Sequence, residues 1–188
     1  MVQESPKVAK VAFLHPDMNV WNSTNLDCII CALELKNYQV VVYRPNDQKS
    51  EHYITYVPRS IFGHFTVLLS YIRFVLCAFH ILLDSTSHFD YIIVNEVSYP
   101  IPLLRLKCSK ILFYCDNPSR RRRSKTSDTS IFFKLLFIII NLIQELTTGM
   151  AHTILVDCQF SQRQFQDNYP IISVPNRKKQ KNIVYYKK

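Results

Sequence analysis

Polar residues follow several apolar runs of the sequence, in positions where a ligand site would be expected. His15 and Asp17 come just after the run VAFL. Three further polar segments, NEVSYP, CDNPSRRRR and DCQFS, begin at residues 95, 115 and 157. Imidazole, carboxylate, amide and guanidinium groups are the side chains that hold sugars and phosphates by hydrogen bonds and charge pairing. Ordinary loops of α/β proteins have the same composition, so a purely structural role is the alternative.

Some of these residues also have plausible structural roles. Asp17 follows Pro16, so it could cap the next helix or fix a turn. Trp21 is as well suited to packing as to stacking on a sugar ring. Gln159 and Ser161 are expected to begin a helix, where the free N–H groups of the first turn can meet a ligand.

Strand-like and helical runs alternate along the chain. The expected strands are residues 8–14, 38–43, 53–57, 90–95, 110–115, 152–157 and 171–174, and the expected helices are 24–37, 65–83 and 130–148. This alternation is typical of right-handed β-α-β units, which build a parallel sheet with helices on both faces. The sequence therefore predicts one α/β, Rossmann-like domain over residues 1–175 and a basic tail at 176–188. Ligands of such sheets lie beyond the carboxyl ends of the strands.

The positive charge of the chain is concentrated in two short segments. The formal net charge is +9, yet residues 120–125 carry five basic side chains and residues 177–188 carry six, without an acidic residue in either segment. Twelve basic and fourteen acidic residues remain elsewhere, so the body of the domain is nearly neutral. This distribution argues against nucleic acid as a partner. It favours contact of Arg120–Lys125 with a membrane surface or a lipid phosphate, and a solvated loop is the alternative.

The six cysteines indicate a reducing environment. All of them lie within or beside apolar runs, and the polar N-terminus does not resemble a secretory signal. We therefore expect buried, reduced thiols. Cys28 and Cys31 form a lone C-x-x-C pair, which is too little to predict a zinc or redox site.

Two of the expected helices are unusually apolar. Residues 65–83 and 130–148 each confine their polar side chains to one stripe, which includes Arg73 and His80 in the first and Asn141 and Glu145 in the second. Neither pattern predicts a membrane span, because charges interrupt the first helix and the uncharged run of the second is too short. A helix in the membrane interface and a heavily buried core helix are both compatible with the pattern.

Several motifs together resemble one enzyme family. FLHPD at 13–17, YVPR at 56–59, FDYIIVNEVS at 89–98, KILFYC at 110–115 and TTGMAHTILVDCQF at 147–160 are similar to segments of the eukaryotic alpha-1,3/1,6-mannosyltransferases. These enzymes act in the dolichol-linked oligosaccharide pathway and belong to glycosyltransferase family 4, which has the two-domain GT-B fold. The resemblance runs from about Lys7 to Tyr169 and implies that residues 1–175 are the N-terminal domain of such an enzyme.

The resemblance also implies an activity. The family transfers mannose from GDP-mannose to a dolichol-diphosphate-linked Man-GlcNAc2 acceptor at the cytosolic face of the endoplasmic reticulum membrane, with retention and without a metal cofactor. The N-terminal domain mainly receives the acceptor lipid, and the C-terminal domain holds the nucleotide sugar. No cofactor and no catalytic residue is assigned to this chain. The residues expected to contact the acceptor are His15, Asp17, Asn22, Asp116, Arg120, Arg121 and Ser161.

The sequence departs from the family pattern in two motifs. The glycine-rich loop G-x-G-G-A-E-R of the family corresponds to residues 19–25, NVWNSTN, which contain no glycine. Because glycine permits positive φ and close approach of the backbone to a diphosphate, this phosphate-binding loop is altered. After KILFYC the family has a histidine, whereas this chain has Asp116, which accepts hydrogen bonds but lacks the chemistry of an imidazole.

Two hypotheses from different classes follow. The first is the acceptor-side domain of a mannosyltransferase, which would use GDP-mannose only where a donor-side domain is supplied. That second domain would begin after about residue 175, so the chain alone is expected to be inactive. The second hypothesis is a non-catalytic module at a membrane surface that associates with another glycosyltransferase.

Overall fold

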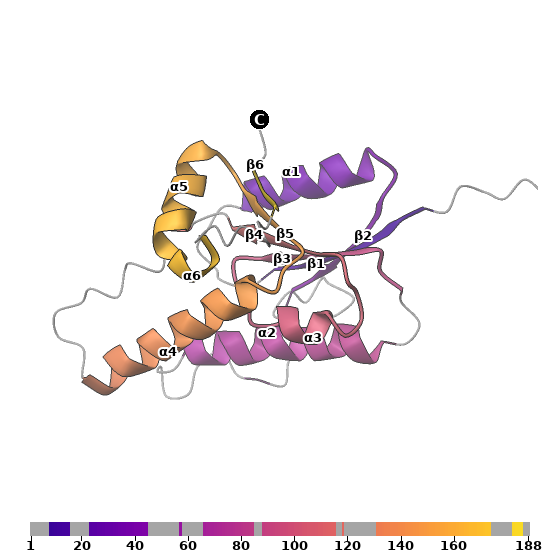
Figure 1. Cartoon of the computed structure of the whole chain (residues 1–188). Helices are drawn as coiled ribbons and strands as arrows, with labels where there is room; N and C mark the ends of the chain where they lie inside the picture. The colour runs from indigo at the N-terminus through magenta and orange to yellow at the C-terminus, as the bar shows by residue number, and fades with distance from the viewer. Residues whose placement is uncertain are drawn as a thin grey trace, which may run out of the picture.

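A computed structural model describes residues 8–15, 23–44, 57, 66–84, 88–115, 118, 131–173 and 182–185 of the 188-residue chain. Helices and strands alternate along most of it (Figure 1). In chain order the elements are β1 (Lys10–Leu14), α1 (Ser23–Glu34), β2 (Gln39–Tyr43), α2 (Thr66–Leu83), β3 (Tyr91–Asn95), α3 (Ile101–Leu104), β4 (Ile111–Cys115), α4 (Ile131–Thr148), β5 (Thr153–Val156), α5 (Gln159–Asn168), α6 (Pro170–Ser173) and β6 (Asn182–Tyr185).

The strands form one six-stranded sheet in the order β2-β1-β3-β4-β5-β6, and every neighbouring pair is parallel. The chain first steps from β1 to β2, then crosses back over β1 to β3 and continues in that direction. The direction of winding therefore reverses between β1 and β3, which makes this the topological switch point of the sheet. The predicted α/β, Rossmann-like fold is confirmed.

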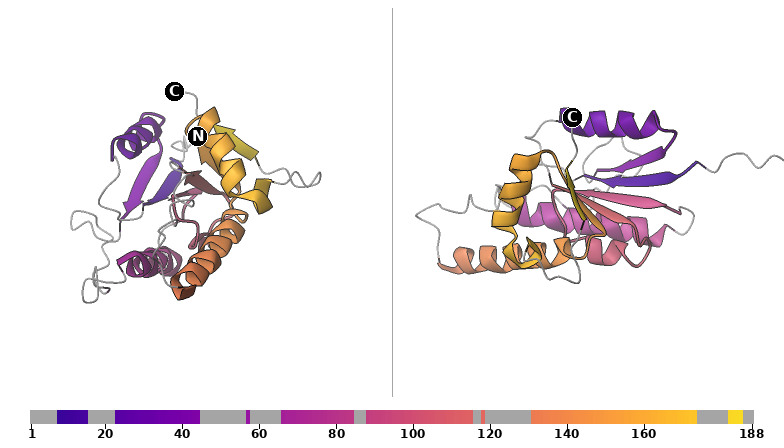
Figure 2. Two further views of the ribbon diagram at one scale, coloured as in Figure 1. Left: turned by 90° about the vertical axis from the view of Figure 1, so that its left-hand side faces the viewer. Right: turned by 45° about the horizontal axis from the view of Figure 1, so that its top comes forward.

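Helices cover both faces of the sheet (Figures 1 and 2). Helix α1 lies on one face, and α2, α3 and α4 lie on the other. Short apolar strands such as β4, ILFYC, suit this position because both faces of a central parallel strand are buried. The α1 side has a small core in which Val11, Phe13 and Ile93 pack against the partly buried Ile29 and Leu33 of α1.

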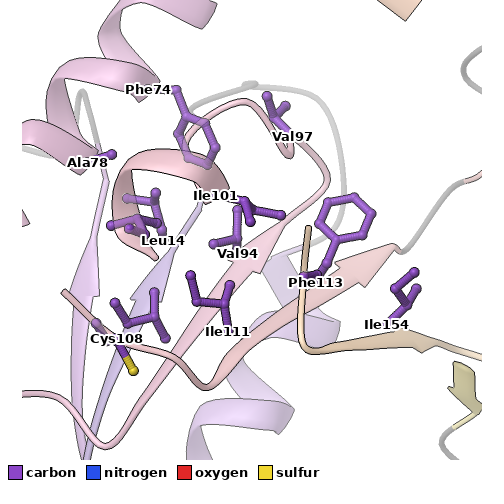
Figure 3. Packing of buried hydrophobic residues seen from close by; sticks show 14 of the residues in the cluster. Leu14, Phe74, Ala78, Val94, Val97, Ile101, Cys108, Ile111, Phe113 and Ile154 are labelled. Atoms are coloured by element: carbon purple, nitrogen blue, oxygen red, sulfur yellow. The ribbon is translucent and has the colours of Figure 1, made fainter. Parts of the chain in front are cut away.

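The larger core lies on the opposite face. Figure 3 shows side chains of β1, β3 and β4 converging on α2 and α3. Leu14, Ile111 and Phe113 are fully buried there, together with Phe74 of α2 and Ile101 of α3. Truncating a large buried side chain such as Phe113 to alanine typically costs about 3–5 kcal/mol, so this layer contributes strongly to the stability of the fold.

Two helices end at specific polar groups. Asn37 takes the left-handed conformation, with φ of 59°, and the Tyr38 N–H donates to the carbonyl of Leu33, so α1 stops there. Asn is the residue that accepts this conformation most readily after glycine. At the end of α2, the Lys107 ammonium donates to the carbonyls of Ile81 and Asp84. A cation at a helix C-terminus also favours the helix dipole.

One predicted strand is wrong. Residues 171–174 were expected to be extended, but Pro170–Ser173 forms the short helix α6. Proline fits the first position of a helix, and the Glu145 carboxylate accepts the Ile171 N–H. The sixth strand is Asn182–Tyr185, inside the segment predicted to be a basic tail. The predicted strand at 53–57 lies outside the described residues, apart from residue 57.

The cysteines only partly follow the prediction of buried thiols. Cys77, Cys108 and Cys115 are buried, whereas the other three, Cys28, Cys31 and Cys158, are exposed. All six are free thiols. Exposure of Cys28 and Cys31 has a simple cause: both lie on the outward side of α1, which buries only the stripe that faces the small core.

Candidate functional site at the carboxyl edge of the sheet

Polar side chains line the carboxyl ends of four neighbouring strands. Asn95 ends β3, Tyr114 lies near the end of β4, and His15 and Asp157 follow β1 and β5. Successive side chains of a strand point to opposite faces, and each of these four lies two residues beyond a side chain of the α1-side core. Those core residues are Phe13, Ile93, Leu112 and Leu155. The sheet therefore places one polar row on the α1 side of this edge.

The centre of the row is a contact between His15 and Asn95. Nδ2 of Asn95 lies 2.8 Å from Nδ1 of His15, across the switch point between β1 and β3. Asn95 is 4% exposed, and its Oδ1 atom is buried with no hydrogen-bond partner in the described part of the chain. A buried polar atom without a partner costs about 1–3 kcal/mol, so such atoms are expected where a ligand or water completes the bonding.

The backbone next to Asn95 is strained. Glu96 has φ of 59°, which is rare for a residue other than glycine or asparagine. Its N–H donates to the Tyr114 carbonyl at 2.9 Å, and its own carbonyl accepts from the Gln144 side chain at 3.2 Å. These bonds hold a conformation that costs about 1–3 kcal/mol and that is most often found at functional sites.

Helix α4 also holds the turn after β3 in place through hydrogen bonds. Ser98 is fully buried and donates through Oγ to the Gln144 carbonyl at 2.8 Å, with the hydroxyls of Thr147 and Thr148 also at 2.8 Å. Tyr99 donates to the Ile140 carbonyl at 2.9 Å. The position of the segment 95–99 therefore depends on α4 as much as on β3.

The other end of the row is built by β5 and α5. Tyr114 donates its hydroxyl hydrogen to the Asp157 carboxylate. Cys158 precedes α5, with its sulfur 3.4 Å from Oγ of Ser161. Hydrogen bonds from the side chain and the backbone of Ser161 lower the pKa of the exposed Cys158 thiol. The edge thus combines an imidazole, an amide, a carboxylate and a thiol, which are groups that can form hydrogen bonds with sugar hydroxyls.

The structure describes two of the seven predicted contact residues. His15 is part of the polar row, and Ser161 is buried in the first turn of α5, as its position at a helix start predicted. Strands β3 and β4 separate the strands that precede these two residues. The other five lie outside the described residues: Asp17, Asn22, Asp116, Arg120 and Arg121.

Sequence reasoning did not single out the residues that complete the row. Asn95, Glu96, Tyr114 and Asp157 were not named individually, although the segments NEVSYP and DCQFS were noted as polar loops with the composition that either a ligand site or an ordinary α/β loop would have. The sequence contained a signal for Asn95 and Asp157. Each is a polar residue that directly follows a short apolar run, YIIV before Asn95 and ILV before Asp157. Nothing in the sequence indicated the left-handed backbone of Glu96.

Neither a metal-binding cluster nor a membrane-spanning helix is present in the described residues. There is no group of three or more His, Cys, Asp or Glu side chains that could hold a metal ion among them. Across the same ranges, none of the helices combines the length and the apolar character that crossing a bilayer requires.

The parallel sheet, the helices on both of its faces and the polar side chains at its switch point are typical of Rossmann-like domains, a class in which ligands bind at this position of the sheet. No family model matches the sequence. The chain is similar to enzymes named alpha-1,3/1,6-mannosyltransferase ALG2, with 32% identity over 180 residues in Dictyostelium discoideum and 31% over 183 residues in Mus musculus. The Homo sapiens enzyme is 29% identical over 189 residues. These results confirm the resemblance predicted from the motifs.

The similarity covers most of this chain and less than half of each relative. It spans 87%, 88% and 91% of the chain, but 42%, 43% and 44% of the Dictyostelium, mouse and human enzymes. The chain thus corresponds to about two fifths of these mannosyltransferases.

Proposed function

We propose that this chain is the acceptor-side domain of a mannosyltransferase of the dolichol-linked oligosaccharide pathway. The observation that carries the proposal is the similarity to alpha-1,3/1,6-mannosyltransferases over nearly nine tenths of the chain. In the whole enzyme, mannose would pass from GDP-mannose to a dolichol-diphosphate-linked Man-GlcNAc2 acceptor at the cytosolic face of the endoplasmic reticulum membrane. GDP-mannose would bind only where a donor-side domain is present.

The polar row suits the acceptor of such a reaction. Asn95 offers an unpartnered amide oxygen beside His15 at the switch point, where it can accept a hydrogen bond from a sugar hydroxyl. In sequence, the predicted contact residues Asp17 and Asn22 follow β1, and Asp116 follows β4. Arg120 and Arg121 would pair with the diphosphate, because guanidinium groups bind phosphate oxygens in a bidentate manner.

A chimera tests this proposal directly. Residues 1–175 of this chain replace the similar part of the Dictyostelium enzyme, and transfer from GDP-mannose to a soluble short-chain Man-GlcNAc2 diphosphate lipid is measured. We expect transfer by the chimera and by the intact relative, and none by this chain alone. A folded chimera without transfer would contradict the proposal.

A pair of histidine variants then locates the site. In the chimera, His15→Ala should lower kcat/KM about 10- to 100-fold, because removing one partner leaves a buried hydrogen-bonding group unsatisfied, which costs about 1–3 kcal/mol. The matched control is His152→Ala, since His152 is exposed and precedes β5 at the opposite edge of the sheet. We expect that control to retain its activity.

A second candidate function is a non-catalytic module at a membrane surface, associated with another glycosyltransferase. The glycine-free segment 19–25 and the exposed apolar side chains of α4 favour it. In that case the purified chain would bind vesicles and co-purify with a full-length mannosyltransferase, while the chimera would fold without transferring mannose.

A further inference from the structure

The backbone turns unusually tightly directly after β3. The Val97 N–H donates to the Asn95 carbonyl at 2.6 Å, and Glu96 between them has φ of 59°. A three-residue turn of this kind, with positive φ at its middle residue, is the rare and strained form of the γ-turn. It persists only where surrounding contacts hold it. Those contacts therefore also set the position of Asn95, the first residue of the turn.

Gln144 of α4 contacts this turn in two ways. Its side-chain nitrogen, Nε2, donates to the Glu96 carbonyl and to the Tyr169 hydroxyl, each at 3.2 Å. Its backbone carbonyl accepts the Ser98 hydroxyl at 2.8 Å and the Thr148 hydroxyl at 2.7 Å. One residue of α4 thus meets the turn and the residue that follows it, and also reaches the end of α5.

The end of α5 is a firm attachment point. Tyr169 is 3% exposed, and its ring stacks on Phe165 with the two centroids 4.2 Å apart. The preceding residue, Asn168, donates from Nδ2 to the carbonyl of Pro118 at 2.9 Å. Pro118 belongs to the segment that follows β4. The end of α5 is therefore bonded to the segment after β4 directly and to the turn after β3 through Gln144.

We propose that Gln144 is a positioning residue for the acceptor, because it holds the turn after β3 so that Oδ1 of Asn95 meets a sugar hydroxyl. The proposal rests on the proposed function. Asn95 is 4% exposed, and its Nδ2 is already engaged 2.8 Å from His15. The direction of the unpartnered Oδ1 then depends on the backbone of Asn95, which the turn fixes. A displacement of about 1 Å at such a contact can cost a large factor in rate.

The chemistry of the contacts requires an amide at residue 144. The Glu96 carbonyl can only accept a hydrogen bond, and Nε2 of a glutamine carries two hydrogens, enough for this carbonyl and the Tyr169 hydroxyl. A methionine side chain has a similar length but no donor, and a carboxylate has only acceptor atoms. Because Gln and Met have similar helix propensities, Gln144→Met removes the donors while α4 remains helical.

Hydrogen exchange of the whole chain tests whether Gln144 holds the turn. In Gln144→Met, the backbone amides of Glu96 and Val97 should exchange about tenfold faster, because one hydrogen bond that closes the turn is lost. The amide of Ile92, near the other end of β3, should change less than about twofold. The matched control is Gln166→Met in α5, since Gln166 is exposed, and it should leave all three rates unchanged.

Steady-state kinetics of the chimera test the role toward the acceptor. Gln144→Met should raise KM for the short-chain diphosphate lipid about tenfold and leave KM for GDP-mannose within about twofold. A smaller fraction of folded protein would lower the apparent kcat and leave both KM values unchanged, so a merely structural role is distinguishable. Gln166→Met should retain both KM values.

A milder variant keeps the test decisive if Gln144→Met does not fold. Tyr169→Phe removes one partner of the Gln144 amide and keeps the ring that stacks on Phe165. It should change the exchange rates and the acceptor KM in the same direction, by about threefold. Unchanged exchange at Glu96 and Val97 would overturn the proposal, and so would faster exchange with an unchanged acceptor KM.

Failure of the proposed function has a different signature. A folded chimera with native Gln144 that transfers no mannose would overturn the proposed function and, with it, the role of Gln144 toward the acceptor. The exchange rates of Glu96 and Val97 are measured without any acceptor, so they would still decide whether Gln144 holds the turn.

Discussion

Asn95 and His15 are 80 residues apart in sequence, yet Nδ2 of Asn95 lies 2.8 Å from Nδ1 of His15. The contact joins the ends of β1 and β3, the pair of strands between which the winding direction reverses. With the amide in this orientation Asn95 is the donor, so His15 accepts at Nδ1 and carries its hydrogen on Nε2. The unpartnered Oδ1 of Asn95 is then the group offered to a ligand.

The tautomer of His15 should follow the chemistry of residue 95. An aspartate has only acceptor atoms, so Asn95→Asp should move the ring hydrogen of His15 to Nδ1. Long-range ¹H–¹⁵N correlation spectra of the labelled chain report the tautomer of each histidine directly. The exposed His88 and His152 serve as internal controls and should not change. An unaltered His15 spectrum would show that the two side chains do not make this bond in solution.

Ser98 should be the most sensitive small polar residue in the turn after β3. Ser98→Ala removes one hydroxyl from a fully buried cluster with Thr147, Thr148 and the Gln144 carbonyl. We expect a loss of about 1–3 kcal/mol in the free energy of unfolding, measured with urea. Ser109→Ala is the matched control, because Ser109 is exposed, and it should cost less than about 0.5 kcal/mol. Equal costs for the two variants would contradict the described cluster.

Much of the fold could be predicted because parallel strands leave a clear pattern. The runs around Phe13, Ile93 and Phe113 are continuous, apolar and short, and each is followed by a polar segment. The runs are continuously apolar because both faces of a central parallel strand are buried. A polar segment follows each run because the loops after parallel strands lie together at one edge of the sheet. The same reasoning placed His15 and Ser161 at that edge.

The errors have identifiable physical causes. The β-branched residues Ile171 and Ile172 suggested a strand, but Pro170 starts a helix and Glu145, 26 residues earlier, accepts the Ile171 N–H. A contact over that distance leaves no trace in local sequence. The strand Asn182–Tyr185 was missed because its four residues lie between clusters of basic residues.

The polarity of α4 shows a different limit. The sequence revealed one polar stripe on an otherwise apolar helix and left an interfacial and a buried position open. Periodicity specifies two faces but not which of them meets the sheet. The side that carries Thr147 and Thr148 faces inward, because the buried hydroxyl of Ser98 needs these threonines as hydrogen-bond partners.

Cys158 should be an unusually reactive thiol. Ser161 lowers its pKa by hydrogen bonding to the thiolate, so the nucleophilic form is already populated at a lower pH than in an ordinary cysteine. The rate of iodoacetamide labelling, followed by peptide mass spectrometry from pH 6 to 10, should show an early rise for Cys158. Ser161→Ala should shift that rise to higher pH and leave the rates of the exposed Cys28 and Cys31 unchanged. A profile that does not respond to Ser161→Ala would contradict this assignment.

Alkaline pH should destabilise the fold through two buried groups. Burial raises the pKa of Cys77 from 9.0 to about 12, and burial, assisted by Asp84 and Cys77, raises that of Tyr43 from 10.0 to about 12. Above pH 9 the unfolded chain releases the thiol proton while the folded chain retains it, so stability falls as pH rises.

The free energy of unfolding should fall by about 1.4 kcal/mol per pH unit for each proton that only the folded state retains. This fall should begin near pH 9 and continue toward pH 12. Urea unfolding at a series of pH values measures it. Cys77→Ala should lose less stability than the native chain between pH 9 and 10, where the thiol contributes and the phenol does not yet. Cys28→Ala, which alters an exposed thiol, should follow the native profile. If both variants followed the native profile, ionisation of Cys77 would not be coupled to unfolding.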